Sequence, residues 1–195
     1  MPSMAHEALA LLFGTPALTE HVLRVELGLE LPAYSEARIE PADLGDVIPR
    51  ELRADQLVVF SEQGEPRLAV VIEAQLRPDE RKAFTWPSYL AGARARFGCP
   101  ASVLVVTLDE VTAAWSARPI LLGPCGSAVR PLVLGPDAVP VIVEEEQARG
   151  CPELAVLSAM AHGRGEAGAK VGETALGALS SLGAERAAVL GEDRL

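Results

Sequence analysis

An aspartate, a glutamate and a glutamine near the middle of the chain are spaced so that they could bind a metal ion together. Asp55 begins a segment rich in β-branched residues, and Glu73 and Gln75 end the next such segment. The polar connection between them contains Gly64 and a proline, which are typical of a turn, so the sequence predicts a β-hairpin. A turn centred on Gly64 pairs Asp55 with Glu73, and the period of two places Gln75 on the same face.

This pairing brings two negative charges close together. Opposed residues of an antiparallel pair have Cβ atoms roughly 5 Å apart, and like charges at that distance repel unless a cation lies between them. A divalent metal site explains the pairing of Asp55 with Glu73; a solvated acidic strand edge is the alternative. The hairpin segments, 53–60 and 67–75, are apolar on both faces, and such strands are normally covered on both sides. A covered carboxylate needs a partner, which favours the metal site.

Further elements are predicted around the hairpin from the spacing of apolar residues and from capping and turn residues. We expect a loop at residues 41–50 and a flexible segment at 162–172. The expected helices lie at residues 4–12, 17–27, 80–97, 110–117, 152–161 and 173–190. The other expected strands lie at residues 34–40, 101–107, 120–122, 129–134 and 139–143.

Two of these helices carry signals that fix their limits. Pro87 lies within the third helix, which we expect to be kinked or to restart with Pro87 in its first turn. Thr107 and Glu110 have the spacing of a capping box and open the short helix that runs to Ala117. Because a crossover helix connects them, the second hairpin strand and the strand that follows are expected to be parallel.

The order of these elements predicts an α/β fold, with a mixed sheet flanked by helices on both faces. We expect the core to span residues 1–150 and a C-terminal helical extension to span residues 151–195. The sequence has no apolar run of membrane-spanning length and no charged-then-apolar leader. Cys99, Cys125 and Cys151 are widely spaced, as free thiols in a reducing compartment would be. We therefore expect a cytoplasmic protein that has no membrane partner.

The charge of the chain is distributed unevenly. The net charge of −10 argues against a general nucleic-acid binder, because phosphate binding relies on Lys and Arg. Residues 50–100, however, hold eight basic and seven acidic residues, and this segment is the least acidic part of the chain. A local phosphate-facing surface explains this balance, and an ordinary solvated helix face explains it equally well.

The arrangement of Asp55, a Val/Ile-rich strand ending in Glu73-Ala74-Gln75, a helix and another buried strand has a counterpart in a known family. It resembles the PD-(D/E)xK nuclease superfamily over roughly residues 4–110. The E-x-Q ending is similar to the branch of recombination-promoting (Rpn-type) and transposase-like nucleases, in which glutamine replaces the usual lysine. The remaining similarities lie in two helices: His6-Glu7 and Leu11–Phe13 in the first, and Arg81, Lys82, Trp86 and Tyr89 in the helix after the motif.

The resemblance implies a restriction-endonuclease-like core in the order α-β-β-β-α-β and a site for Mg²⁺ or Mn²⁺. Asp55 and Glu73, with the carbonyl of Ala74, would bind the ion, which would polarise a phosphodiester oxygen and activate a water. Gln75 can only form hydrogen bonds, so the charge of the usual lysine would come from elsewhere. Lys82 or Arg81 could supply it.

Alternatives remain open for these last residues and for the function. The alternative for Arg81 and Lys82, which their sequence context favours, is that they are surface cations that balance Asp79 and Glu80. The aromatic residues of the same helix could stack on bases or belong to the core. The resemblance implies a Mg²⁺-dependent endonuclease that acts on nucleic acid, with DNA the expected substrate. The alternative is a catalytically inactive nuclease-fold module for binding or regulation, associated with mobile elements or with an unknown protein partner. A homodimer is compatible with either.

Overall fold

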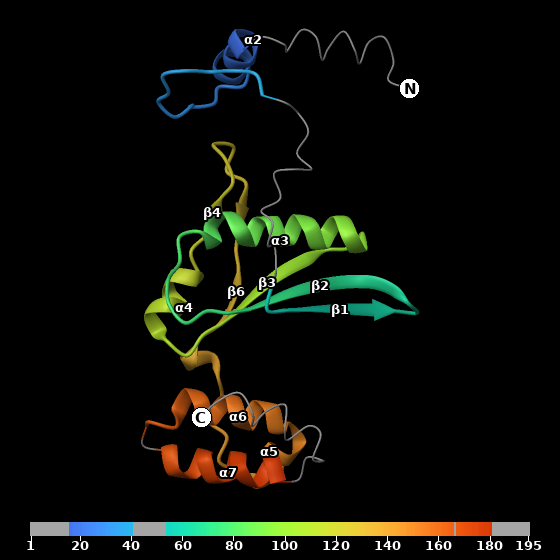
Figure 1. The fold of residues 1–195 in the computed structure, drawn as a ribbon, viewed down its shortest axis with the longest axis vertical. Helices are drawn as coiled ribbons and strands as arrows, with labels where there is room; N and C mark the ends of the chain where they lie inside the picture. Colours follow the sequence, from blue (N-terminus) through green and yellow to red (C-terminus); the bar gives the residue numbers. More distant parts are fainter. Residues whose placement is uncertain (1–15, 41–53, 166, 181–195) are drawn as a thin grey trace. The chain divides into compact units, whose positions relative to one another are not determined.

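The computed structural model describes residues 16–40, 54–165 and 167–180, and these fall into two compact units. The first unit comprises residues 16–40 and 119–130. Its α2 helix (Pro16–His21) continues into the π-helical turn η1 (Val22–Glu26), close to the expected helix at 17–27. It also contains the short antiparallel pair β4 (Ile120–Leu121) and β5 (Ala128–Val129) (Figure 1).

The second unit contains a four-stranded mixed sheet in the order β1-β2-β3-β6 (Figure 1). The strands are β1 (Gln56–Glu62), β2 (Glu65–Ala74), β3 (Ala101–Val106) and β6 (Leu132–Leu134). β1 and β2 are antiparallel, whereas β2, β3 and β6 run parallel to one another. Helix α3 (Lys82–Phe97) connects β2 to β3, and α4 (Glu110–Ser116) follows β3. The predicted α/β fold with a mixed sheet is therefore confirmed.

The hairpin turn consists of two residues with left-handed backbone conformations. Gln63 has φ 51° and Gly64 has φ 84°, and Glu62 pairs with Glu65 across the turn. Positive φ at both central positions is typical of the type I′ turn, whose twist matches that of the flanking strands. The turn is therefore centred between Gln63 and Gly64, half a residue before the centre expected from the sequence.

A bulge in the hairpin corrects this difference. Ser61 pairs with Pro66 and Phe60 pairs with Leu68, so Arg67 is an extra residue on β2. From Phe60 back to Gln56 the register is regular, and one further step places Asp55 opposite Glu73. The predicted pairing of these two residues is therefore the one that the strand register gives.

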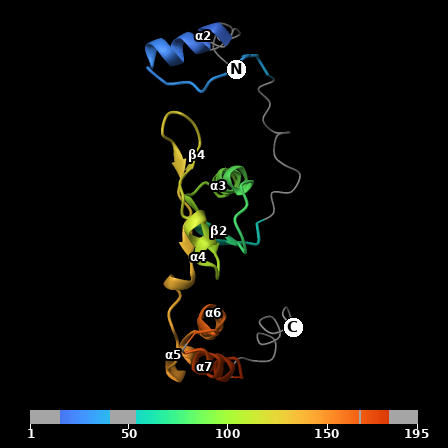
Figure 2. The same ribbon diagram turned by 90° about the vertical axis from the view of Figure 1, so that its left-hand side faces the viewer.

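One face of the sheet is covered by α3 (Figure 2). The residues of β2 and β3 that point to this face alternate along the strands and are buried: Ala69, Val71, Glu73, Val103 and Val105. Trp86, Tyr89 and Ala93 are the buried residues of α3, spaced along one side of the helix. Glu73 therefore lies in the layer between the sheet and the helix.

The opposite face of the sheet is not covered by the residues that the structure describes. Its apolar side chains are exposed or only half-buried, among them Val58, Phe60, Leu68, Val70, Ile72, Leu104, Val106, Leu132 and Leu134. Phe60 is 55% exposed and Leu132 is 56% exposed. The expectation that both faces of the hairpin are covered is thus wrong for the described part of the chain, because α3 packs on one side only and β1 is an edge strand.

Two of the expected strands are not strands. Residues 34–40 are exposed and pair with no described strand, so the order α-β-β-β-α-β is reduced to two described strands before α3. Residues 139–143 are extended, but their backbone groups bond to helices in place of a sheet. An apolar, alternating pattern predicts an extended segment, and only the presence of a neighbouring strand makes it part of a ladder.

Two helix limits also differ from expectation. Pro87 lies in the interior of α3, which starts at Lys82, so the helix neither begins nor restarts at the proline. The N-cap of α4 is Asp109, whose side chain accepts hydrogen bonds from the backbone and hydroxyl of Thr112 at 2.7 Å each. Asp is as good an N-cap as Thr, and the cap is two residues later than the predicted capping box. The expected helix at 4–12 and loop at 41–50 lie outside the described residues.

The C-terminal helices pack on one another around a small cluster. α5 (Glu145–Gly150), α6 (Pro152–His162) and α7 (Gly168–Ser180) follow the short 3₁₀ helix η3 (Pro136–Ala138), and α5 was not predicted. Their shared core consists of small or branched residues: Ile142, Ala148, Ala155, Ala175 and Ala178. α7 starts within the segment expected to be flexible, and its expected end at 190 lies outside the described residues. The boundary at residue 150 stays a prediction.

The extended segment before these helices is fixed to them by side chains. The Ile142 amide donates to Ser158 Oγ (2.9 Å), and Thr174 Oγ1 donates to the Val143 carbonyl (3.2 Å). The His162 ring bonds to the carbonyl of Val139 (2.8 Å). Within the described ranges, every helix is too short or too polar to cross a bilayer.

The C-terminus of α3 offers a test of the backbone geometry. Gly98 caps the helix with φ 62°, and its amide donates to the Arg94 carbonyl (2.9 Å). We expect Gly98→Ala to lower the free energy of unfolding by about 1 kcal/mol, because a Cβ is strained in the left-handed region. The matched control is Gly92→Ala in the same helix, where a Cβ meets open space and where we expect a gain of about 1 kcal/mol. Urea unfolding of both variants checks this, and a shift of the same sign in both would contradict it.

Candidate metal centre

The position opposite Glu73 is of the kind at which paired side chains approach most closely, and Asp55 directly precedes Gln56, the first paired residue of β1. The odd-numbered residues Ala69 and Gln75 donate backbone hydrogen bonds toward β3, to Pro100 and Val106. The even-numbered residues of β2 therefore form the ladder with β1, and Glu73 is at a non-hydrogen-bonded position of that ladder. Side chains at such positions are closest. Asp55 lies in a bend just before β1, and its carboxylate bonds to the amide of Ala74, the residue next to Glu73.

Asp55 directly precedes β1, and there its side chain bonds to β2 in place of the β1 backbone. Its Oδ2 accepts a hydrogen bond from the Ala74 amide at 2.8 Å, and the side chain is exposed. The carbonyl of Ala74 points to the same edge as its amide, because both groups of one residue serve the same neighbouring strand. One carboxylate oxygen of Asp55 and the Ala74 carbonyl therefore lie beside the last residue of β2, just beyond the first residue of β1.

Glu73 is almost completely buried, and it is paired with a lysine. Its side chain is 2% exposed, and Oε2 forms an ion pair with Nζ of Lys82, whose side chain is 21% exposed. A buried carboxylate needs such a partner, because an unpaired charge in a low-dielectric interior is costly. Lys82 is the first residue of α3, so the start of that helix determines which cation reaches the sheet.

Arg81, the neighbouring cation, is engaged elsewhere. Its guanidinium bonds to both carboxylate oxygens of Asp79, at 3.0 and 2.8 Å. These hydrogen bonds, from the side chain first and then from the Arg81 backbone, lower the pKa of Asp79 from 3.8 to about 2. The interpretation of Arg81 as a surface cation that balances Asp79 therefore holds, whereas Lys82 is directed to Glu73.

Gln75 is buried, and its amide is held by the loop that follows β2. Nε2 donates to the carbonyl of Arg77 at 2.6 Å, and the side chain lies on the same face as Glu73 by strand alternation. This bond uses the donor end of the amide and leaves the oxygen as an acceptor. Gln75 thus shapes the connection between β2 and α3, which carries Lys82.

The two aromatic residues of α3 belong to the core. Trp86 is 1% exposed and Tyr89 is 8% exposed, so stacking on a nucleic-acid base is not open to them in this conformation. Trp86 packs against Trp115, with ring centroids 5.7 Å apart and planes inclined by 59°. Trp115 in turn donates from Nε1 to Glu80 (3.1 Å), a contact that the sequence did not indicate.

Tyr89 is also an electrostatic neighbour of both acids. Burial first, and then the charges of Glu73 and Asp55, raise the pKa of the Tyr89 phenol above its ordinary value of 10.0. The seven-residue spacing from Lys82 to Tyr89 places both on one side of α3 and was the available sequence signal.

The donor set suits a hard cation that keeps part of its water shell. Among the described residues, no three or more His, Cys, Asp and Glu side chains are grouped so that they could hold a metal ion. A metal here would depend on Asp55, Glu73 and the Ala74 carbonyl, all oxygen donors. Mg²⁺ typically binds proteins through one or two carboxylates and retains several waters, so these residues fit it.

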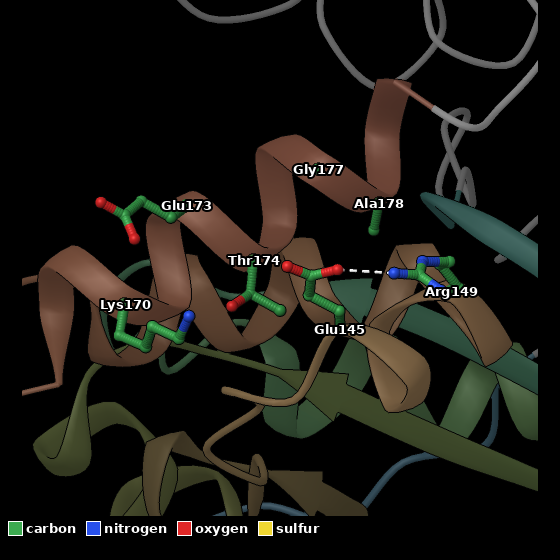
Figure 3. Close-up of a pocket in the computed structure, with 7 residues that line it drawn as sticks. All are labelled: Glu145, Arg149, Lys170, Glu173, Thr174, Gly177 and Ala178. Carbon is green, nitrogen blue, oxygen red and sulfur yellow. Dashed lines mark hydrogen bonds and ion pairs between the residues drawn. The ribbon is translucent and has the colours of Figure 1, made fainter.

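A separate pocket of about 220 Å³ lies between α5 and α7 (Figure 3). Its lining residues are Glu145, Arg149, Lys170, Glu173, Thr174, Gly177 and Ala178. Glu145 and Arg149 form an ion pair across its rim at 2.5 Å. No residue of this pocket was singled out from the sequence, and none of them belongs to the acid pair.

Comparisons of the chain with protein-family models, with curated proteins and with solved structures find no match. The resemblance of the motif to the PD-(D/E)xK superfamily therefore depends on the residues themselves. What the described geometry contributes is the hydrogen bond that joins Asp55 to Ala74, beside Glu73, and the ion pair that joins Glu73 to Lys82.

Proposed function

We propose that this chain is a metal-dependent nuclease that hydrolyses phosphodiester bonds in nucleic acid, with DNA as the expected substrate and Mg²⁺ or Mn²⁺ as the cofactor. The observation that carries the proposal is that Asp55 bonds to Ala74, the residue next to Glu73, while Glu73 itself pairs with Lys82. Two acids and a lysine are the residue types that the PD-(D/E)xK motif combines. Here the lysine comes from α3, while Gln75 occupies its usual place in the strand.

Each residue has a distinct task in this proposal. Asp55, Glu73 and the Ala74 carbonyl would hold the ion, which when bound polarises the scissile phosphate and makes a water more acidic. Asp55 is kept in position by the hydrogen bond from the Ala74 amide. Lys82 supplies a positive charge beside Glu73 that could stabilise the developing negative charge on the phosphate. Gln75 fixes the loop that leads to Lys82 through its bond to Arg77.

A second candidate is a nuclease-fold module that binds but does not cleave. It is favoured by the ion pair of Lys82 with Glu73, which neutralises the buried acid without a metal ion. In such a module the pair would be purely structural. The two functions differ in one measurable property, the dependence of phosphodiester cleavage on Asp55.

We expect Asp55→Asn to lower the rate of Mg²⁺-dependent plasmid nicking at least about 10²-fold, because one charged ligand is lost. Asparagine still offers an oxygen to the Ala74 amide, so the end of β1 should keep its structure. The control is Asp79→Asn, which removes an acid of the same type whose side chain pairs with the exposed Arg81 in place of Lys82.

The assay uses supercoiled plasmid, with Mg²⁺ titrated and with all variants at equal concentration. Nicking by the wild type that Asp55→Asn abolishes and Asp79→Asn retains would support the nuclease. Cleavage that survives Asp55→Asn would refute the assigned site. A folded wild type that binds plasmid and never nicks it, at any Mg²⁺ or Mn²⁺ concentration, would favour the second candidate.

A further inference from the structure

We propose that Lys82 competes with the metal ion for Glu73, so that metal binding in this protein exchanges one cation for another. The inference rests on the proposed metal centre and adds a determinant of its affinity. It concerns the metal-free protein. It predicts that loss of the Lys82 charge tightens metal binding but slows cleavage.

The first support is the identity of the partner that Glu73 has. Its Oε2 atom, one of the two oxygens that a metal ion could use, is in contact with the Lys82 ammonium. Asp55, in contrast, is exposed and accepts a hydrogen bond from an uncharged amide. Among the described residues, the contacts of the two acids therefore differ, since an ammonium lies beside the buried acid and a backbone amide beside the exposed one.

The second support is that Lys82 can leave without a change of fold. It is the first residue of α3, and its backbone amide bonds to the Asp79 carbonyl (2.9 Å), so its position is fixed by the main chain. The side chain is 21% exposed, whereas Glu73 is 2% exposed. A lysine stem has four rotatable carbons, and its ammonium is readily hydrated, so rotation of the side chain alone can carry the charge toward water.

Two consequences follow from this arrangement. The ion must replace the contact between Lys82 and Glu73, and the lysine, once displaced, still lies nearby and repels a divalent cation. Removal of the lysine charge should therefore tighten metal binding. The same removal should slow cleavage in the proposed nuclease, because the positive charge beside the phosphate is lost.

The test is titration calorimetry of the full-length chain with MnCl₂, without nucleic acid. We expect Lys82→Gln to bind Mn²⁺ about tenfold more tightly than the wild type, which corresponds to about 1.4 kcal/mol. Glutamine can still donate a hydrogen bond to Glu73, so this variant leaves the buried acid with a partner. Lys82→Arg retains the charge, and Arg81→Gln removes a neighbouring charge that pairs with Asp79; both should bind Mn²⁺ as the wild type does.

A second readout covers the case in which Lys82→Gln is poorly folded. The rise in Tm caused by a given Mn²⁺ concentration should be larger in Lys82→Gln than in the wild type, because a ligand that binds more tightly stabilises the folded state more. Equal or weaker Mn²⁺ binding by Lys82→Gln would overturn the competition and leave the metal centre intact. If none of the folded variants binds Mn²⁺, the metal centre itself is wrong, and the inference falls with it.

Discussion

Replacement of Glu73 by glutamine should reduce metal-dependent cleavage by about 10³-fold, the largest effect on activity that we expect from a single site. Glu73 is the buried acid of the pair, and glutamine removes its charge while it keeps its shape. Rates of plasmid nicking at saturating Mg²⁺, compared with those of the wild type, give the measurement. Mn²⁺ titration of the same variant should show no binding.

The stability of this variant provides the control. Glu73→Gln leaves the Lys82 ammonium without its acid, but that side chain can reach water, so we expect a loss of only about 1 kcal/mol. The double variant Glu73→Gln/Lys82→Gln, which has no charge at either position, should recover most of this loss, and the cycle isolates the ion pair. Full nicking activity in a folded Glu73→Gln protein would contradict the assigned role.

The largest effect on stability should come from Trp86. This side chain is 1% exposed between the sheet and α4, and Trp86→Ala should lower the free energy of unfolding by about 3–5 kcal/mol through the cavity that it leaves. Because Trp86 lies four residues after Lys82 on α3, we also expect the variant to lose metal binding under conditions where it is partly unfolded. Urea unfolding followed by far-UV circular dichroism measures the loss.

Trp86→Phe is the informative companion of this variant. The indole Nε1 of Trp86 is buried and has no hydrogen-bond partner among the described residues. Phenylalanine makes fewer packing contacts, which lowers the free energy of unfolding, and it removes a polar group that is costly to bury, which raises it. The two effects therefore oppose each other. We expect a loss of less than about 1.5 kcal/mol. A loss as large as that of Trp86→Ala would mean that the N–H is satisfied.

The hairpin and its acid pair were predictable because the turn residues are distinctive. Gly64 marked the turn, and counting outward from it gave the pairing of Asp55 with Glu73. From Gln56 to Phe60 the observed register agrees with that count, for a reason that the sequence did not show. The turn is centred half a residue earlier, and the extra residue Arg67 on β2 restores the register. Bulges have weak sequence signals, since they depend on the twist of both strands.

The choice between Lys82 and Arg81 could not be made from the sequence. Successive residues of a helix point about 100° apart, so a shift of one residue in the start of α3 would have exchanged their roles. Gln75 bonds to the Arg77 carbonyl and Arg81 pairs with Asp79 in the loop before α3. These side-chain contacts show which cation stays outside the site, and residue spacing alone does not specify them. The strand predicted at residues 139–143 was wrong for a related reason, because the partners of this segment are helices that lie later in the chain.

In the proposed nuclease, the ion pair between Glu73 and Lys82 has a consequence for the stability of the metal-free protein. Many metalloproteins unfold in a chelator, since stripping the ion exposes uncompensated acids to one another. Here the buried Glu73 keeps Lys82 as its counterion when no metal is bound. We therefore expect EDTA to leave the protein folded but without cleavage activity, and Mg²⁺ to restore that activity. Purification in chelating buffers is therefore compatible with later assays.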